Sequence, residues 1–353
     1  MGESPIPHGS GSHHTALSLT MFPESDDPII AFAYFEWILA YFLRKSKYIL
    51  LVLTFLVNLC YDVKKKKVII MMEIKRMNQT DVNKLLPKRR DVSHKGDYGR
   101  VLLLCGSRGF TGAAALAAMG ALRSGAGVVY LAVPESIYTI EAVKLLEPVI
   151  IPVDDQDGMY SVRAKNTILS LLPKMDAVLI GPGIGQSGGT FDMVKTVLEN
   201  SECPVILDAD GINVLSEHKD ILRDRNLPTI LTPHDGEFCR LGKNIGEDRC
   251  ASAALLAKDL GCIVLLKGHH TVITDGKICY INDTGNPGMA TGGSGDVLAG
   301  IIVSLLGQGL DPLAAASCGA WLHGAAGDIC AQEIGQYGML PQDMVRVLPR
   351  LLR

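Results

Sequence analysis

Short, fully apolar runs alternate with helical segments from residue 101 onward, and this alternation restricts the folds open to the chain. A strand that is apolar on both faces is typical of a parallel sheet covered by helices on both sides. We therefore predict a doubly wound α/β fold, with a mostly parallel sheet in a single domain. The predicted strands are 101–105, 128–133, 149–153, 177–180, 205–208, 229–232, 263–267, 271–274 and 278–281. The predicted helices are 112–124, 163–172, 191–199, 251–260, 296–306, 312–332 and 342–351.

The first 76 residues differ in character from the rest, so we divide the chain into an N-terminal extension, 1–76, disordered or apolar helical, and a domain, 77–353. Two apolar stretches lie at 29–43 and 48–61, and the first contains Glu36. Each is shorter than the roughly 20 residues of a spanning helix. A membrane anchor through residues 29–61, a helical hairpin and a segment upstream of the native start codon remain open. We favour the last, because the globular pattern is complete without residues 1–71.

Composition narrows the class of protein. The formal net charge is −3, and no basic stripe suggests a nucleic-acid surface. The nine cysteines include no C-x-x-C pair, and several lie in apolar runs, as buried reduced thiols do. These features favour a protein of the reducing cytoplasm that has no nucleic-acid partner.

The strongest chemical signal is the segment N-P-G-M-A-T-G-G-S-G-D, which ends at Asp296 and leads into an apolar helix. Glycine N–H groups ahead of a helix start can converge on an anion, and the helix adds partial positive charge. An aspartate in a first helical turn often only complements the helix dipole. Small residues surround Asp296, however, and a carboxylate beside a phosphate site is awkward unless it acts chemically, so we favour a catalytic base.

Six segments in order then resemble a known family, and the glycine turn itself resembles the GxGD signature of the ribokinase-like superfamily. The other five segments are 95–113, which contains K-G-D-Y-G and G-S-R-G-F-T-G-A, then G-P-G-I-G at 181–185, D-A-D-G-I-N at 208–213, L-T-P-H-D-G-E at 231–237 and L-K-G at 266–268. Together they resemble the ADP-dependent (S)-NAD(P)H-hydrate dehydratases. The fused epimerase domain of that family has no counterpart here, which matches the stand-alone bacterial type.

The resemblance implies a ribokinase-like fold and a role in nicotinamide cofactor repair. The substrates would be the hydrated cofactors NADHX and NADPHX in their S form. Phosphoryl transfer from ADP, or ATP, with Mg²⁺ would activate the added hydroxyl, and loss of phosphate would restore NADH or NADPH. Asp296 would remove the hydroxyl proton, and the glycine turn would stabilise the transferring phosphoryl group.

The resemblance also assigns site residues. Those that contact the hydrated dinucleotide would be Ala113, Gly185, His234 and Asp296. Those that hold the nucleotide would be Lys267, Gly268, His269, His270, Thr271, Gly292, Gly293 and Gly295. The metal ligands stay unknown, and Glu237 is either a helix-start carboxylate or an indirect ligand.

Three further sites are interpreted from local sequence. Adjacent side chains on an extended segment point apart, so we discount a metal site at His269 and His270. Asp208 stays open between a magnesium ligand and another role, whereas Asp210 with Asn213 is interpreted as capping a short helix. His323 lies in a helix rich in small residues, and we expect it to pack in the core.

Two alternatives remain. A vitamin or sugar kinase on the same fold would carry the same turn but stop at the phosphorylated product. An inactive regulatory or membrane-tethered module would have lost Asp296 or the glycines, and both are present. The family resemblance also implies a homo-oligomer, a tetramer, that works with a separate NAD(P)HX epimerase.

Overall fold

The computed structural model describes residues 73–352. The predictions for the extension upstream of residue 73 lie outside these residues. Among the helices of residues 73–352, none combines the length and apolar character needed to cross a membrane.

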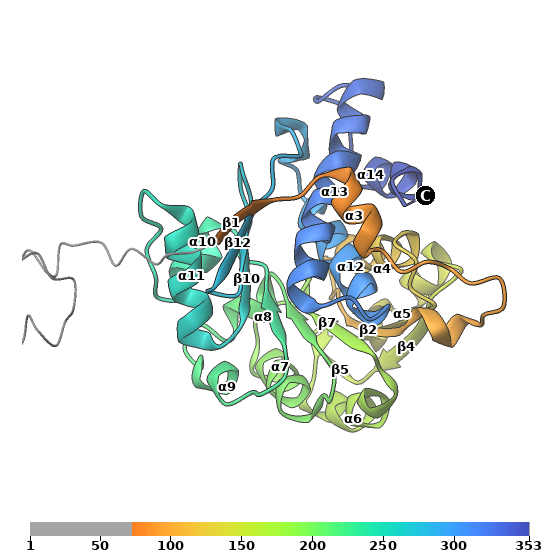
Figure 1. Cartoon of the computed structure of the whole chain (residues 1–353). Coiled ribbons are helices and arrows are strands. Elements are labelled where there is room, and N and C mark those ends of the chain that lie inside the picture. Colours follow the sequence, from red (N-terminus) through yellow and green to blue (C-terminus); the bar gives the residue numbers. More distant parts are fainter. Residues whose placement is uncertain (1–72, 353) are drawn as a thin grey trace, which may run out of the picture. The chain divides into compact units, whose positions relative to one another are not determined.

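One large sheet runs through the described residues (Figure 1). In order across the sheet, its ten strands are β1 (Glu73–Arg76), β12 (Ile278–Ile281), β11 (Val272–Thr274), β10 (Ile263–Leu266), β9 (Thr229–Leu231), β8 (Val205–Leu207), β7 (Ala177–Ile180), β2 (Arg100–Leu104), β3 (Val128–Pro134) and β4 (Val149–Val153). β11 is antiparallel to both of its neighbours, and the other pairs are parallel. The prediction of a mostly parallel sheet is confirmed, and every predicted strand is found within one residue at either end.

Strand β1 lies on the other side of the predicted domain boundary. It occupies residues 73–76 and pairs in parallel with β12, with Glu73 opposite Ile278 and Arg76 opposite Ile281. The sheet therefore begins four residues before the predicted domain boundary at residue 77. The domain has to include at least residues 73–76. The remainder of the predicted extension lies outside the described residues.

Helices cover both faces of the sheet. Those in the described part are α3 (Gln79–Leu85), α4 (Thr111–Arg123), α5 (Glu135–Lys144), α6 (Lys165–Leu171), α7 (Gly188–Asn200), α8 (Asp210–Asn213), α9 (Asp220–Arg223), α10 (Asp235–Arg240), α11 (Arg249–Leu260), α12 (Ser294–Gly307), α13 (Pro312–Glu333) and α14 (Pro341–Val347). Along β2, Val101 and Leu103 join the apolar core under α4, α12 and α13. Leu102 and Leu104 join the core under α6, α7 and α11. Because both faces are buried, the strands are apolar at successive positions.

Helix α12 lies between α4 and α13 (Figure 1), and glycines allow its backbone to touch α4. A Cβ atom on Gly300 would lie 2.2 Å from the carbonyl oxygen of Ala117 in α4. A Cβ atom on Gly120 would lie 2.7 Å from the carbonyl oxygen of Val297 in α12. Such distances leave no room for a side chain at either position. The close crossing with α4 therefore fixes the position of the N-terminal end of α12.

We predict that Gly300→Ala destabilises the fold. Alanine normally stabilises a helix interior relative to glycine. Here the added methyl group would meet the backbone of Ala117, which cannot rotate away as a side chain could. Overpacking of this kind costs about 1–3 kcal/mol of unfolding free energy, measured by denaturant unfolding. Gly188→Ala is the matched control, because a Cβ atom at that helix position meets nothing within 4 Å. Equal stability of the two variants would contradict the close crossing.

Candidate active site

The motifs found in the sequence follow neighbouring strands. Strands β10, β9, β8, β7 and β2 are adjacent in the sheet and parallel to one another, so the segments that follow them meet at one edge. Lys267 follows β10, Asp208 follows β8 and Gly181 follows β7, while His234 comes three residues after β9. Open parallel sheets bind ligands at this edge, which makes it the candidate active site.

The glycine turn closes the same edge and begins α12. Gly293 is the N-cap residue, with a φ angle of 95° that favours glycine. The N–H groups of Gly295 and Asp296 have no hydrogen-bond acceptor within residues 73–352, as is usual in a first helical turn. A Cβ atom on Gly295 would lie only 3.6 Å from Lys267 Nζ. Free N–H groups, the helix terminus and a nearby ammonium group together suit a phosphate.

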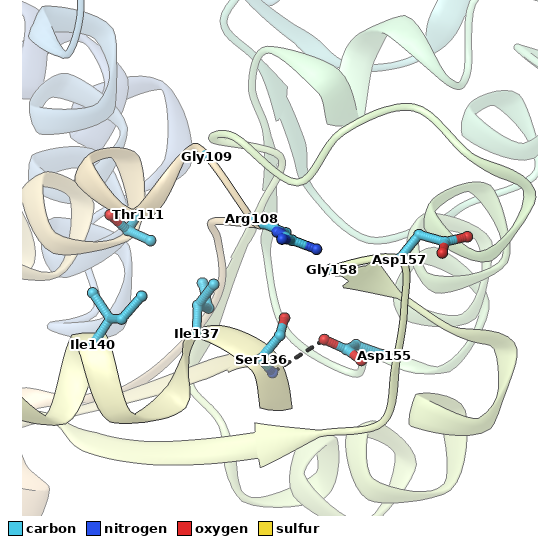
Figure 2. Close-up of a pocket in the computed structure, with 9 residues that line it drawn as sticks. All are labelled: Arg108, Gly109, Thr111, Ser136, Ile137, Ile140, Asp155, Asp157 and Gly158. Atoms are coloured by element: carbon cyan, nitrogen blue, oxygen red, sulfur yellow. Dashed lines mark hydrogen bonds between the residues drawn. The ribbon is translucent and has the colours of Figure 1, made fainter.

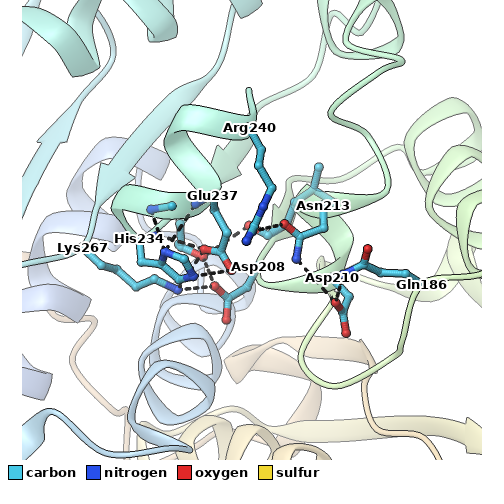
Figure 3. A network of polar contacts seen from close by, with 11 residues as sticks. Gln186, Asp208, Asp210, Asn213, His234, Glu237, Arg240 and Lys267 are labelled. Atoms are coloured by element: carbon cyan, nitrogen blue, oxygen red, sulfur yellow. Dashed lines mark hydrogen bonds and ion pairs between the residues drawn. The ribbon is translucent and has the colours of Figure 1, made fainter. Parts of the chain in front are cut away.

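Lys267 is the centre of a buried charge network (Figure 3). Its Nζ atom lies 2.7 Å from Asp208 Oδ1 and 3.7 Å from Glu237 Oε2. Thr232 Oγ1 donates a hydrogen bond of 2.7 Å to the same oxygen of Asp208. Burial acts to lower the pKa of Lys267, but the two carboxylates outweigh it and the pKa is raised. Lys267 is therefore charged, and Asp208, whose role the sequence left open, is its ion-pair partner.

Asp296 lies in the first turn of α12, beside this network. Burial, followed by the negative charge of Asp208, raises the pKa of Asp296 to about 6, although Lys267 acts in the opposite direction. Such a carboxyl group is ionised at neutral pH but accepts a proton more readily than an ordinary aspartate, as a general base should. The geometry and the pKa support the predicted role of Asp296, which stays a prediction.

His234 and Glu237 form a capping box at the start of α10. His234 Nδ1 accepts hydrogen bonds from the N–H groups of Gly236 at 2.9 Å and Glu237 at 3.3 Å. In return, Glu237 Oε2 accepts from the N–H of His234 at 2.8 Å. Glu237 is thus a helix-start carboxylate, one of the two roles considered for it. The side chain of His234 is 54% exposed, so it can also reach a ligand.

The expectation that His269 and His270 point apart is wrong. They form a turn between β10 and β11 rather than an extended segment, because His270 has a left-handed φ angle of 55°. Their ring centroids lie 3.9 Å apart, and Thr271 Oγ1 closes the turn by donating to the carbonyl of Gly268 at 2.9 Å. Within residues 73–352, no three His, Cys, Asp or Glu side chains converge as a metal site would require.

The start of α4 meets the loop after β7. A Cβ atom on Gly183 would lie 2.9 Å from the Cβ of Ala113, so Ala113 borders the loop that carries Gly185. The N–H of Gly185 donates to Asp210 Oδ2 at 3.0 Å, and Gln186 Nε2 donates to Oδ1 at 2.9 Å (Figure 3). The interpretation of Asp210 as a helix cap is wrong, because α8 has Ala209 at its N-cap and no side-chain cap. Asp210 instead fixes the loop that carries Gly185.

A cavity of about 440 Å³ opens beside the first turn of α4 (Figure 2). It is lined by Arg108, Gly109, Thr111, Ser136, Ile137, Ile140, Asp155, Asp157 and Gly158. The last three come from the small hairpin β5 (Asp155–Gln156) and β6 (Met159–Tyr160), which the sequence analysis missed. The N–H of Arg108 donates to the carbonyl of Gly158 at 2.8 Å and joins this hairpin to the segment after β2. Thr111 and Ala113 share a helical turn, so the cavity adjoins the predicted dinucleotide site.

Comparison with known proteins identifies the family. The profile of the NAD(P)H-hydrate dehydratase family matches residues 101–350. The chain belongs to this family. It is 46% identical over 275 residues to the bifunctional NAD(P)H-hydrate repair enzyme Nnr of Moorella thermoacetica, which covers 76% of this chain and 52% of Nnr. The chain thus spans about half the length of the curated relatives it matches.

Two solved structures share the fold. The ADP/ATP-dependent NAD(P)H-hydrate dehydratase of Bacillus subtilis, co-crystallized with ATP/Mg²⁺, is 33% identical, with a TM-score of 0.67 over 78% of this chain and 96% of its own. A ribokinase-like superfamily protein of Enterococcus faecalis is 27% identical, with a TM-score of 0.71 over 79% of this chain and 95% of its own. The predicted ribokinase-like fold and the family resemblance are confirmed. The assigned roles of individual site residues remain predictions.

We predict that Asp296→Asn stabilises the fold at neutral pH. The folded protein holds the Asp296 proton up to about pH 6, whereas the ordinary value is 3.8. The native state thus binds more protons between these values, and its stability falls as the pH rises through them. The ionised carboxylate costs about 2–3 kcal/mol above pH 6.

Denaturant unfolding at several pH values tests this linkage. The stability gained by Asp296→Asn should grow between about pH 4 and pH 6, the interval between the ordinary and the raised pKa, and should stay constant above it. Asp224→Asn, at an exposed carboxylate, should give no such gain. A gain independent of pH would show that Asp296 is not the titrating group.

Proposed function

We propose that this protein dehydrates the S forms of NADHX and NADPHX to NADH and NADPH, with ADP or ATP as the phosphoryl donor. One observation carries the proposal: a carboxylate with a raised pKa, Asp296, stands in the first turn of a helix whose free N–H groups suit a phosphate. The Bacillus subtilis relative was co-crystallized with ATP/Mg²⁺, which supports the choice of nucleotide and metal.

Asp296 would begin the reaction by accepting the proton of the added hydroxyl group. The hydroxyl oxygen then bonds to the terminal phosphorus of the nucleotide, and the bond to the bridging oxygen breaks. N–H groups of the turn at Gly295 and Asp296, with the ammonium group of Lys267, would stabilise the charge on the transferring phosphoryl group. The phosphate then leaves with the C–O bonding electrons, and a proton lost from the neighbouring carbon restores the ring double bond.

Mg²⁺ fits this site as part of a complex with the nucleotide. In proteins it is commonly held by one or two carboxylates together with substrate phosphates, and Asp208 and Glu237 supply carboxylates beside the turn. When bound, the ion would neutralise charge on the phosphates during transfer. Lys267 would compete for the same carboxylates, so we assign no geometry to the ion.

The remaining site residues fit two ligands. His234, Ala113 and Gly185 would contact the hydrated dinucleotide on one side of Asp296. The turn from Lys267 to Thr271, together with Gly292, Gly293 and Gly295, would hold the nucleotide on the other. Gly268 supports this, because it is exposed beside Lys267 and its φ angle of 153° favours glycine.

The assembly and cellular context are proposed on family grounds. We propose a homotetramer that acts in the cytoplasm, where its dinucleotide substrates are formed, beside an epimerase that supplies the S form. A kinase that stops at a phosphorylated product finds less support, since a hydroxyethylthiazole kinase of Pyrococcus horikoshii is only 16% identical, which speaks to the fold alone.

We predict that the protein restores NADH from its hydrate only when ADP or ATP and Mg²⁺ are all present. ADP should serve at least as well as ATP. The measurement is recovery of the near-ultraviolet absorbance of NADH from the S hydrate. Repair without nucleotide would refute the phosphoryl-transfer route, and phosphorylation of a sugar or vitamin instead would establish the kinase alternative.

Replacing Asp296 by asparagine should lower turnover by about 10²–10⁴-fold, the usual contribution of a general base. Nucleotide binding should survive, because the N–H groups of the turn are unchanged. In the wild type, kcat/KM should fall as the pH drops below about 6, since protonation removes the base. A pH–rate profile with the same acid limb in Asp296→Asn would assign that limb to another group.

A further inference from the structure

The segment 285–294, which leads to the glycine turn, lies against α13 rather than on the sheet. Just ahead of it, Thr284 Oγ1 donates a hydrogen bond of 3.0 Å to the carbonyl of Trp321 in α13. A Cβ atom on Gly324 would lie 2.6 Å from the carbonyl oxygen of Thr284, so the backbone of Thr284 packs directly against α13. A Cβ atom on Gly327 would likewise lie 2.3 Å from the sulfur of Met289.

Asp328 of α13 holds the beginning of this segment. Its Oδ2 accepts from the N–H of Gly285 at 2.9 Å, and its Oδ1 accepts from Asn286 Nδ2 at 3.0 Å. Asn286 cannot rotate its amide, because its Oδ1 atom accepts from the N–H of Gly288 at 3.0 Å. The three residues therefore form a directional set of hydrogen bonds in which position 328 has to accept twice.

His323, also of α13, touches the end of the segment. It is only 8% exposed, which confirms the expected core position. Its Nε2 atom lies 3.3 Å from Ser294 Oγ, two residues before Asp296. Burial lowers the pKa of His323 to about 4, so the imidazole is neutral at physiological pH and acts as a hydrogen-bonding group.

We propose that Asp328 and His323 are positioning residues, which hold the two ends of segment 285–294 so that the phosphate-binding turn and Asp296 stay aligned. The inference rests on the proposed function. Phosphoryl transfer depends on alignment of the base, the hydroxyl and the phosphorus atom, and a displacement of about 1 Å can cost about 100-fold in rate. Residues that touch no ligand can therefore control turnover by fixing those that do.

Asp328→Asn tests the first contact. The new amide can accept from Gly285, but its NH₂ group would face the NH₂ group of Asn286. We expect kcat to fall by about 10–100-fold, with the KM for ADP changed much less. The reciprocal double variant Asn286→Asp with Asp328→Asn restores a donor opposite an acceptor at unchanged net charge, and it should recover most of the lost kcat.

His323→Leu and His323→Gln test the second contact. Leucine fills the space but cannot hydrogen-bond, whereas the glutamine amide can still reach Ser294. We expect the leucine variant to lose kcat and the glutamine variant to retain most of it. Equal loss in both would mean that only the shape of histidine matters, and would overturn its role as a hydrogen-bonding positioner.

Asp311→Ala is the matched control for both tests. Asp311 is the N-cap of α13 and accepts from the N–H groups of Leu313 and Ala314, so its loss weakens the same helix away from the site. We expect a lower thermal midpoint with unchanged kcat. The inference is overturned if Asp311→Ala loses as much kcat as Asp328→Asn, if Asp328→Asn stays within twofold of the wild type, or if the double variant remains as slow as the single.

Amide hydrogen exchange gives a readout that does not need activity. Exchange in the peptide that covers residues 285–296 should accelerate in Asp328→Asn and His323→Leu but not in Asp311→Ala, because local opening follows the loss of local hydrogen bonds. If the wild type repairs no hydrated cofactor while these exchange rates still rise, the proposed function fails and the positioning role stands. Unchanged exchange in both variants would overturn the positioning role even in an active enzyme.

Discussion

The rest of the structure depends on the contact between α4 and α12, where backbone meets backbone. Gly120 and Gly300 lack the side chains that would separate the helices, and a wide apolar core presses α12 against the sheet. A helix held in this way cannot slide along its axis without opening the core. Its first turn, with Gly295 and Asp296, therefore stays at the edge where the strand ends bring Lys267 and Asp208.

The charged side chains at this edge of the sheet lower the stability of the folded protein. Asp208, Glu237 and Asp296 surround one ammonium group, that of Lys267. Lys267 forms a short ion pair with Asp208, so it stabilises the ionised form of Asp296 only in part. Burial therefore has the largest effect on the pKa of Asp296. Burial disfavours the ionised form of Asp296, which lowers the stability of the fold and would also suit the proposed general base. The same desolvation accounts for both properties.

The sheet and the glycine turn were predictable because their signals are local. Strands buried on both faces are apolar at every position, and the turn is recognised by its glycines directly before a helix. Strand β1 was missed because E-I-K-R is largely charged; it joins the sheet through backbone pairing with β12. The ion pair of Lys267 with Asp208 joins residues far apart in the chain, and Asp328 reaches segment 285–294 from another helix. No local sequence pattern predicts such pairings. The turn that brings the rings of His269 and His270 together depends on the left-handed φ angle of His270.

The capping box at α10 has a consequence for the chemistry available to His234. Its Nδ1 atom is committed as an acceptor for two backbone N–H groups, which places the ring proton on Nε2. The Nε2 atom can then only donate, and it already lies 3.4 Å from Glu237 Oε1, so a ligand oxygen would share this donor with the carboxylate. His234 can donate to a carbonyl, hydroxyl or phosphate oxygen. It could accept a proton only at Nδ1, and this would break the two hydrogen bonds that cap α10. In the proposed reaction, this helix cap would limit His234 to orienting the dinucleotide and would leave removal of the proton to Asp296.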